Sequence, residues 1–514
     1  MDKHQMILAG AASAFALGAV ATWRLGVLSE SQHLLPTSSS GTQPRRRRRR
    51  LTEHKCTIAP VCKADVGPRN VFITYGFVVP RKLDSERLRN ALYALVAHWP
   101  NLGCRLGRNE HGDFVFILPT EFSEAVPPLS WSSTYHAESY NAASSRPALP
   151  PHLSSSADLP HPVIVDMPQM APLFRDESRP HTLEDLLDNE APLLEARVTV
   201  FEDVTFVGLT STHLFADASG MGSLVSAWLS ALDGKFPDPD SVLPLGSPTL
   251  AAWTSDFPRI QEYGAWYRPD IWGRLAMRMW RNLKQWVDPV EDMKLVTIPK
   301  TYLAEVRDAL VVQDSQLSSS DVLVAWLTKA LYSDAGWFTR SIYLNIPVDV
   351  RSLVPELHGK LVLNAFDEIG VPPLPASRSS VTDIATAVRR AIAQYRALSD
   401  GHVRRSMAFK TASFDSVALR GWWMSWREPY LLLSNWRRAG LAQLDWSSAA
   451  AESTAVPVHS SVVLPYILTN GQAVRGLVWV VGEDEEKVWA TIVLGRKAWG
   501  QALCNLLTFG CELL

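Results

Sequence analysis

The chain has little cysteine: there are five in 514 residues, an odd number, and no two of them form a C-x-x-C pair. This scarcity argues against a disulfide framework and against a zinc site, and reduced thiols fit a body that faces the cytosol. The sequence also lacks any N-x-S/T sequon, which agrees with a body that stays outside the secretory lumen.

A large charge of either sign is also missing. The formal net charge is −2, charged residues make up 20% of the chain, and hydrophobic residues make up 47%. Nothing in this balance favours nucleic acid as a partner. The hydrophobic content is ordinary for a globular protein with a large core, and the length suits two to four domains.

Long hydrophobic runs are absent except at the N-terminus. Residues 6–23 carry no charge, and a run of that length can just cross a bilayer. Arg24 and the six arginines from Arg45 to Arg50 follow it, so the positive-inside rule places the body in the cytosol. We predict a membrane anchor, in the endoplasmic reticulum, and a disordered tether to residue 50. A cleaved signal peptide and a soluble start remain alternatives.

From about residue 51 the pattern becomes globular. Runs of β-branched and aromatic residues predict strands at residues 71–79, 196–212 (two strands), 341–346, 462–468, 476–481 and 488–494. Apolar residues at helical spacing predict helices over residues 84–98, 222–232, 318–332 and 497–507.

Strands and helices alternate in both halves of the globular part, which predicts an α/β fold with two domains. We place an N-terminal domain at residues 51–235 and a C-terminal domain at residues 297–514, joined by a crossover at residues 236–296. Residues 126–180 are dense in proline, serine and histidine, and we predict a long surface insertion there.

The strongest chemical candidate is the H-x-x-x-D pattern from His213 to Asp217. His213 follows a predicted strand and precedes small residues and a helix, so its side chain can be presented to a cleft. An imidazole can take a proton from an attacking alcohol or amine near neutral pH. A second match, from His181 to Asp185, lies in polar sequence, and we interpret it as surface. The residues alone leave open that His213 is a satisfied core histidine.

The segment around His213 resembles the H-x-x-x-D-G region of the BAHD acyltransferases, a family within the chloramphenicol-acetyltransferase-like fold. Three more segments resemble that family in its own order: SSSDVLVAWLTKAL at residues 318–331, LNIPVDVRSLVPEL with LVLNAF at residues 344–366, and LLLSNWRRAGLAQLDWSSA at residues 431–449. The resemblance covers roughly residues 70 to 500. It implies two such domains, each a mixed sheet flanked by helices, with an active-site tunnel between them.

The resemblance also implies roles for individual residues. His213 would be the general base. Asp217 would be structural and would pair with Arg351, because a partly buried carboxylate needs a cation. Asp445 matches the first residue of the family's D-F-G-W-G motif, which supports the shape of the site.

Other matched positions would contact the substrates. Ser434 and Trp436 would line the acyl pocket and donate to the developing oxyanion. Ser320 and Asn364 would lie on the coenzyme A side. The implied reaction moves an acyl group from acyl-CoA to a hydroxyl, or an amine, of a small secondary-metabolite acceptor. It needs no metal, and we expect a monomer with no nucleic-acid partner.

The sequence also departs from the family pattern. Ala218 stands where the family has glycine, and D-F-G-W-G has become Asp445-Trp-Ser-Ser-Ala449. Thr212 stands where peptide-synthetase condensation domains have a second histidine, which disfavours amide formation on carrier proteins. The degraded motif suggests one rival function, a catalytically silent binding protein of the same fold. The N-terminal run suggests a second rival, a lipid-associated scaffold.

The crossover is rich in tryptophan. On a helix over residues 271–287, one face would carry Trp272, Leu275, Met279, Leu283 and Trp286, bordered by basic residues. Such a helix can lie in a membrane interface or pack on the domains with its arginines reaching solvent. We favour the packed interpretation.

Overall fold

The computed structural model describes residues 55–142, 160–180, 182–245, 291–311, 316–332, 341–375, 378–398, 400–411, 430–468 and 475–496, with some single residues and short segments between them. All described residues belong to one compact unit, residues 51–514. The predicted anchor at residues 6–23 and the arginine run lie outside the described residues. Within the described part, no helix is both long enough and apolar enough to cross a membrane.

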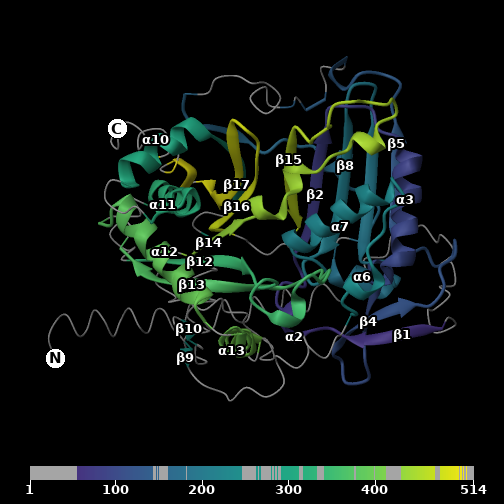
Figure 1. The fold of residues 1–514 in the computed structure, drawn as a ribbon, viewed down its shortest axis with the longest axis horizontal. Coiled ribbons are helices and arrows are strands. Elements are labelled where there is room, and N and C mark those ends of the chain that lie inside the picture. The colour runs from purple at the N-terminus through teal and green to yellow at the C-terminus, as the bar shows by residue number, and fades with distance from the viewer. Residues whose placement is uncertain are drawn as a thin grey trace. The chain divides into compact units, whose positions relative to one another are not determined.

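Five strands form the first sheet, in the order β15-β2-β8-β7-β5 (Figure 1). They are β2 (Phe72–Val79), β5 (Ser130–Tyr135), β7 (Leu194–Val200), β8 (Thr205–Thr212) and β15 (Val462–Leu468). Only β5 and β7 pair in parallel. Every residue of β2 and β8 is buried, because both faces of the sheet are covered. The strands predicted at 71–79, within 196–212 and at 462–468 are confirmed.

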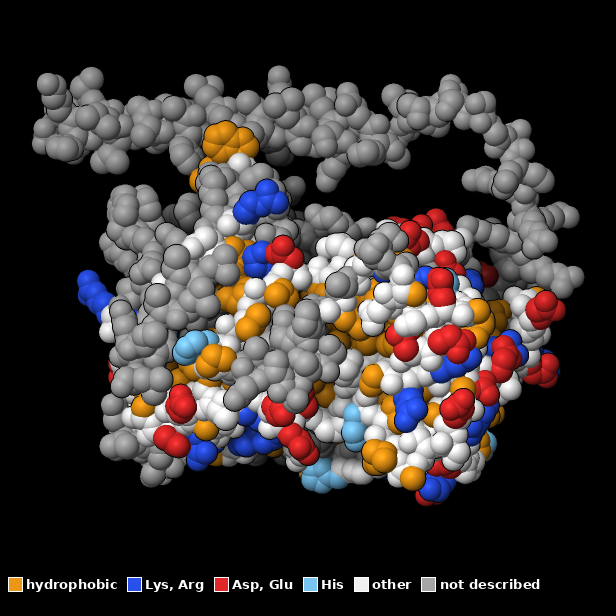
Figure 2. All heavy atoms as spheres, turned by 90° about the horizontal axis from the view of Figure 1, so that it is seen from above, with side chains coloured by type: hydrophobic (Ala, Val, Ile, Leu, Met, Phe, Trp, Pro, Cys, Tyr) orange, Lys and Arg blue, Asp and Glu red, His pale blue; other side chains and the backbone are white. Residues whose placement is uncertain are grey.

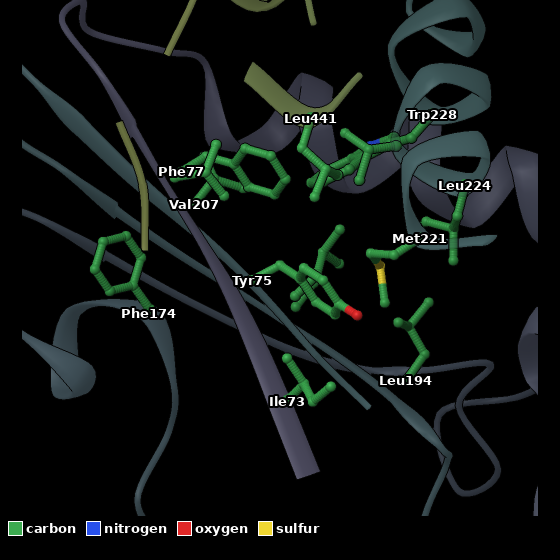
Figure 3. Packing of buried hydrophobic residues seen from close by; sticks show 14 of the residues in the cluster. Ile73, Tyr75, Phe77, Phe174, Leu194, Val207, Met221, Leu224, Trp228 and Leu441 are labelled. Atoms are coloured by element: carbon green, nitrogen blue, oxygen red, sulfur yellow. The ribbon is translucent and has the colours of Figure 1, made fainter. Parts of the chain in front are cut away.

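Two helices cover one face of this sheet: α3 (Ser85–His98) and α7 (Ala218–Ala231). They confirm the predicted helices at 84–98 and 222–232, although α7 begins four residues earlier. The indole N–H of Trp228 donates to the main-chain oxygen of Leu88 at 2.8 Å and so ties α7 to α3. Figure 3 shows Met221 of α7 facing Tyr75 of β2 in this core.

The second sheet has seven strands, in the order β13-β12-β14-β16-β17-β11-β6. They are β6 (Val163–Asp166), β11 (Glu291–Pro299), β12 (Ile342–Asp349), β13 (Phe366–Leu374), β14 (Tyr430–Asn435), β16 (Leu477–Glu483) and β17 (Lys487–Gly495). The central β12, β14 and β16 run in parallel, and the other pairs are antiparallel. The sheet is therefore mixed, and it confirms the strands predicted at 341–346, 476–481 and 488–494.

Helices α10 (Lys300–Val311), α11 (Ser319–Tyr332) and α12 (Val381–Arg396) pack with this sheet around a second hydrophobic core (Figure 1). The predicted helix at 318–332 is α11. The start of α12 is fixed by a capping box, in which Ser380 and Asp383 bond each other's main-chain N–H groups.

Each half of the chain contributes one strand to the sheet of the other half. Strand β15 follows the C-terminal strand β14 in sequence but pairs with β2, and β6 precedes β7 in sequence but pairs with β11. The two halves of the chain are thus connected by exchanged strands. The predicted boundaries at residues 235 and 297 stay a prediction.

The predicted surface insertion at residues 126–180 is wrong over much of its length. It contains β5, β6 and the short helix α5 (Ala171–Phe174), and Phe174 is fully buried against the first sheet. Both strands lie at the edge of a sheet, where a strand needs only one partner and little apolar sequence. The high proline and serine content of the segment therefore led to the prediction of a surface insertion in place of these two strands.

The remaining elements flank the two sheets. A three-stranded sheet is formed by β1 (Cys56–Pro60), β4 (Phe114–Pro119) and β3 (Arg105–Arg108), and the short pair β9 (Glu262–Tyr263) and β10 (Trp266–Tyr267) lies in the crossover. Three further helices are α2 (Lys63–Val66), α6 (Leu183–Asn189) and α13 (Asp400–Thr411). Helix α13 packs against α2.

Of the predicted crossover helix over residues 271–287, the structure describes Met279, Leu283 and Trp286. Met279 and Leu283 are each 42% exposed and Trp286 is 81% exposed. The choice between the packed and the membrane-interface interpretation stays a prediction. On the face shown in Figure 2, acidic and basic side chains are interspersed among hydrophobic ones.

Candidate active site

His213 lies immediately after the last residue of β8, as the sequence pattern predicts. Its main-chain N–H donates to the oxygen of Val71 at 2.8 Å, which continues the ladder between β2 and β8 by one residue. The residue is half-buried, and its ring lies 5.0 Å from the ring of Phe366, the first residue of β13. The imidazole therefore stands at the end of one sheet and contacts the other, and it is not sealed in a core.

The surroundings of His213 favour a neutral imidazole. Burial lowers its pKa, and its own main-chain carbonyl and the charge of Asp217 oppose that effect only in part. Nδ1 is buried and has no hydrogen-bond partner in any other described residue. A neutral imidazole carries one proton and one lone pair, and because Nδ1 is buried, Nε2 is the nitrogen left to exchange a proton with a ligand.

Asp217 organises the turn that follows His213. It is the N-cap of α7 and accepts from the N–H of Gly220 at 2.7 Å. Its other oxygen accepts from the N–H of Ala365 at 2.7 Å, and its own N–H donates to the oxygen of Leu363 at 3.0 Å. Asp217 is buried, so these bonds fix the start of α7 against the segment that leads into β13.

The structure brings Asp217 and Arg351 together. The guanidinium donates to both carboxylate oxygens at 3.0 Å and to the oxygen of Val362 at 2.7 Å. Burial alone would lower the pKa of Arg351, but Asp217 and Asp349 more than reverse this and raise it. The guanidinium therefore keeps its charge, and the pair joins β8–α7 of one sheet to the turn after β12 of the other.

Asn364 lies beside His213 in this arrangement. Its amide donates to the main-chain oxygen of His213 at 2.9 Å, while its Oδ1 is buried without a partner in the described part of the chain. The residue that the family resemblance placed on the coenzyme A side is thus in direct contact with the backbone of the candidate base.

Helix α7 also depends on two glycines that the sequence pattern did not single out. A Cβ added to Gly220 would lie 1.9 Å from the main-chain oxygen of Leu363, and one added to Gly222 would lie 2.2 Å from that of Ala439. The first turn of α7 therefore touches two segments of the C-terminal half. One is the segment that contains Asn364, and the other is the turn that follows β14.

We expect Gly220→Ala to destabilise the protein by at least about 3 kcal/mol, since the clash is with rigid backbone on both sides and not with a flexible side chain. Urea unfolding checks this. Gly500→Ala is the matched control, because a Cβ there meets nothing within 4 Å. Equal midpoints for the two variants would show that α7 is free to shift away from Leu363.

Ser434 and Trp436 lie at the end of β14 and after it. The indole N–H of Trp436 donates to the Oγ of Ser434 at 2.9 Å, and the Trp436 ring lies 5.3 Å from that of Tyr75 in β2. Trp436 is 6% exposed and Ser434 is half-buried. The indole N–H of Trp436 is used in this hydrogen bond, which orients the side chain of Ser434. Because the Ser434 oxygen is the acceptor in the bond, its hydroxyl proton remains available to donate to another group.

Ser320, at the start of α11, joins the same region through an arginine. Arg437 donates to the Oγ of Ser320 at 2.7 Å and to Glu483 at 3.0 Å, and its Nε donates to Asn435 at 3.2 Å. Ser320 is thus held close to the turn that carries Trp436. Its predicted contact with coenzyme A stays a prediction.

Asp445 lies apart from these residues, on an exposed loop. It accepts from the N–H groups of Ser447 at 2.9 Å and Val458 at 3.0 Å. Burial would raise its pKa, but these bonds and the nearby His459 outweigh that and lower it. The next residue, Trp446, is fully buried and contacts the ring of Phe77 at 5.3 Å. The loop therefore keeps a fixed shape without the glycines of the family motif.

No family model matches the sequence. The curated relatives of the chain include two fungal transferases. The acetyltransferase adrJ of Penicillium roqueforti is 25% identical over 462 residues, which cover 81% of this chain and 88% of that protein. The O-acyltransferase pboC of Aspergillus ustus is 24% identical over 394 residues, covering 72% of this chain and 80% of that protein.

Solved structures share the fold at low sequence identity. TRI101 of F. graminearum, complexed with coenzyme A and T-2 mycotoxin, superposes with a TM-score of 0.60 at 12% identity and covers 87% of this chain and 96% of its own. Vinorine synthase superposes with a TM-score of 0.55 at 14% identity, covering 92% and 95%.

These comparisons confirm the predicted fold, and they agree with the predicted acyltransferase activity. The chain is an acyltransferase with the chloramphenicol-acetyltransferase-like fold. Among proteins of that class, it is similar to fungal acetyltransferases and O-acyltransferases.

Proposed function

We propose that the protein transfers an acyl group from acyl-CoA to a hydroxyl of a small acceptor, with His213 as the general base. The observation that carries this is the position of His213, a half-buried imidazole at the end of β8. Its Nδ1 is turned into the protein, and Phe366 of the opposite sheet contacts its ring.

The reaction follows from these groups. Nε2 of His213 takes the proton of the acceptor hydroxyl, and the oxygen attacks the carbonyl carbon of the thioester. The C–S bond then breaks, and the protonated imidazole returns the proton to the departing thiolate of coenzyme A. Ser434 would donate its hydroxyl proton to the oxyanion that forms between these steps.

The start of α7 supports this proposal because it links the groups that must act together. Asp217 fixes the helix to the segment of Asn364, and Gly222 lies against the turn that follows Trp436. The base on one sheet and the candidate oxyanion donor on the other are thereby held in one arrangement. Relatives of the fold bind coenzyme A together with a small acceptor, T-2 mycotoxin in the case of TRI101.

The transferase proposal is tested with acetyl-CoA and a panel of small alcohols, by following the free thiol that a transferase releases. An acceptor-dependent release of thiol, with the matching ester found by mass spectrometry, is the expected result. A protein that binds acetyl-CoA but releases no thiol with any alcohol would instead be the silent binding protein.

The pH profile of kcat/KM gives a second test. Only the neutral imidazole can accept a proton, so activity falls as pH drops through the pKa of His213. Burial lowers that pKa, so we expect the acid limb to have its midpoint below 6.5, the ordinary value for histidine. A limb centred above pH 7 would assign the base to another group.

The membrane anchor belongs to this proposal as well. The anchor would keep the enzyme beside apolar acceptors, and the uncharged run at residues 6–23 is the observation that supports it. Residues 51–514 form a compact unit by themselves, so catalysis would not depend on the anchor.

A further inference from the structure

The imidazole of His213 is attached to a well-fixed backbone, but no hydrogen bond from another described residue holds the ring itself. Val71 and Asn364 bond the main-chain N–H and carbonyl of His213. Within the described part of the chain, Nδ1 is buried without a partner and Nε2 forms no hydrogen bond. A histidine side chain can rotate about two bonds, so the backbone contacts alone do not decide where Nε2 points.

The carboxylate of Asp217 does not orient the ring either. Many catalytic histidines are oriented by a carboxylate that accepts the proton of one ring nitrogen. Asp217 instead accepts from the main-chain N–H groups of Gly220 and Ala365. The guanidinium of Arg351 donates to both of its oxygens as well. The orientation of the imidazole must therefore come from packing.

The ring of Phe366 packs against the imidazole. The two ring centroids are 5.0 Å apart, and the ring planes are inclined by 57°. Both residues are half-buried. Among the residues that the structure describes, no other aromatic ring contacts the imidazole. Because closely packed side chains block each other's rotation, the phenyl ring restricts the rotamers that His213 can adopt.

Phe366 is itself firmly placed. It is the first residue of β13, which pairs with β12 from that residue onward. The preceding residue, Ala365, donates its N–H to Asp217 at 2.7 Å, and its oxygen accepts from the N–H of Val350 at 3.1 Å. The carboxylate that caps α7 therefore also fixes the start of β13. A ring on such a backbone is a fixed surface against which an imidazole can be oriented.

We propose that Phe366 is the positioning residue of the general base, and that its ring holds the imidazole of His213 in the rotamer that presents Nε2 to the acceptor hydroxyl. This inference rests on the proposed transferase function. The contact does by packing what a carboxylate does by a hydrogen bond in other histidine bases. The ring also keeps water from one side of the imidazole, which favours the neutral form that a base requires.

Replacing Phe366 with alanine tests the proposal through kcat. Without the phenyl ring the imidazole can populate roughly six rotamers, three about χ1 and two about χ2, of which one is productive. Phe366→Ala should therefore lower kcat by about threefold to sixfold, measured by thiol release, and leave the KM of acetyl-CoA and of the acceptor unchanged. Phe366→Leu, which keeps an apolar side chain against the imidazole, should retain most of kcat. A rise in the KM of the acceptor at unchanged kcat would make Phe366 a wall of the acceptor site and overturn the proposal.

The pH profile separates positioning from a general loss of stability. Burial lowers the pKa of His213, and the charge of Asp217, which is paired with Arg351, opposes this effect in part. Removing the phenyl ring lets water reach the imidazole, so the acid limb of kcat/KM in Phe366→Ala should move up toward 6.5. A limb that stays at the wild-type pH would overturn the proposal, because the ring would then not cover the imidazole.

Phe236→Ala is the matched control. Phe236 is half-buried and stacks on another histidine, His98, with the ring centroids 3.9 Å apart. The variant removes a phenyl ring from a histidine that the proposed reaction does not use, so kcat and the acid limb should equal those of the wild type. A fall in kcat as large as that in Phe366→Ala would make the effect a general one and overturn the proposal.

A crystal structure of the Phe366→Ala variant tests the orientation without any substrate. We expect the imidazole of His213 to occupy more than one rotamer in the variant and a single rotamer in the wild type. A single, unchanged rotamer in the variant would overturn the role of Phe366. Failure of the wild type to release thiol with every alcohol would instead count against the transferase function, and the rotamers would still decide whether Phe366 orients His213.

Discussion

Replacing His213 with alanine is expected to lower kcat by about 10³-fold, within the range that general base catalysis contributes, while acyl-CoA still binds. The reason is positional. His213 is held by Val71 and Asn364 through its backbone, so the variant loses the imidazole without disturbing the strand end. Turnover measured by thiol release, with binding of acetyl-CoA measured by calorimetry, checks both halves of this expectation.

His111→Ala is the control for this experiment, because the His111 side chain is 75% exposed on the turn between β3 and β4. It should leave kcat and binding unchanged. An active His213→Ala variant would remove His213 from the mechanism, and an unfolded one would give it a structural role. Circular dichroism of the variant distinguishes these two outcomes from the expected one.

The second large effect concerns the ion pair between the sheets. Asp217→Ala should lower the free energy of unfolding by about 3–5 kcal/mol, because it leaves the charge of Arg351 buried and unpaired. The side chains of the pair are only 8% and 15% exposed, so solvent screens the interaction little. The variant also loses the cap of α7 and the bond to Ala365, which act in the same direction.

A double variant shows how much of this loss is due to the unpaired charge. Arg351→Met combined with Asp217→Leu removes both charges, and it should be more stable than Asp217→Ala alone. Arg89→Ala, which breaks the exposed pair with Glu86, should shift the midpoint far less. A folded, fully stable Asp217→Ala enzyme that is merely slow would give Asp217 a chemical role in place of a structural one.

The sequence predicted the centre of the fold better than its edges. The strands that became β2, β8, β16 and β17 lie inside their sheets and are buried along almost their whole length, which favours the β-branched and aromatic residues that predicted them. Strand β15 is an edge strand, but its sequence is apolar enough to have been predicted as well. Strand β5 is a partly exposed edge strand with three serines and a threonine, so it carries little apolar pattern. Strand β6 is apolar at three positions but only four residues long, too short to stand out from the polar sequence around it. The exchange of strands between the halves likewise leaves no local signal, since pairing partners are set by tertiary contacts.

The candidate site, too, was predicted from the sequence only in part. The strand end and the small residues after it predicted that His213 stands where a strand ends, and the structure places it directly after β8, half-buried and 5.0 Å from the ring of Phe366. Its presentation to a cleft stays a prediction. The pairing of Asp217 with Arg351 links residues far apart in sequence, and only the family resemblance could suggest it. The close approach at Gly220 depends on which backbone packs nearby, which no local pattern reveals.

The central claim is that acyl transfer takes place at the imidazole of His213, between the two sheets. A crystal structure of the protein with coenzyme A tests it most directly. We predict that the thiol sulfur lies within about 3–3.5 Å of Nε2 of His213, the range of a near-attack contact, with the hydroxyl of Ser434 turned toward the same position. Coenzyme A bound with its sulfur away from His213, or no coenzyme A bound between the sheets, would contradict the account.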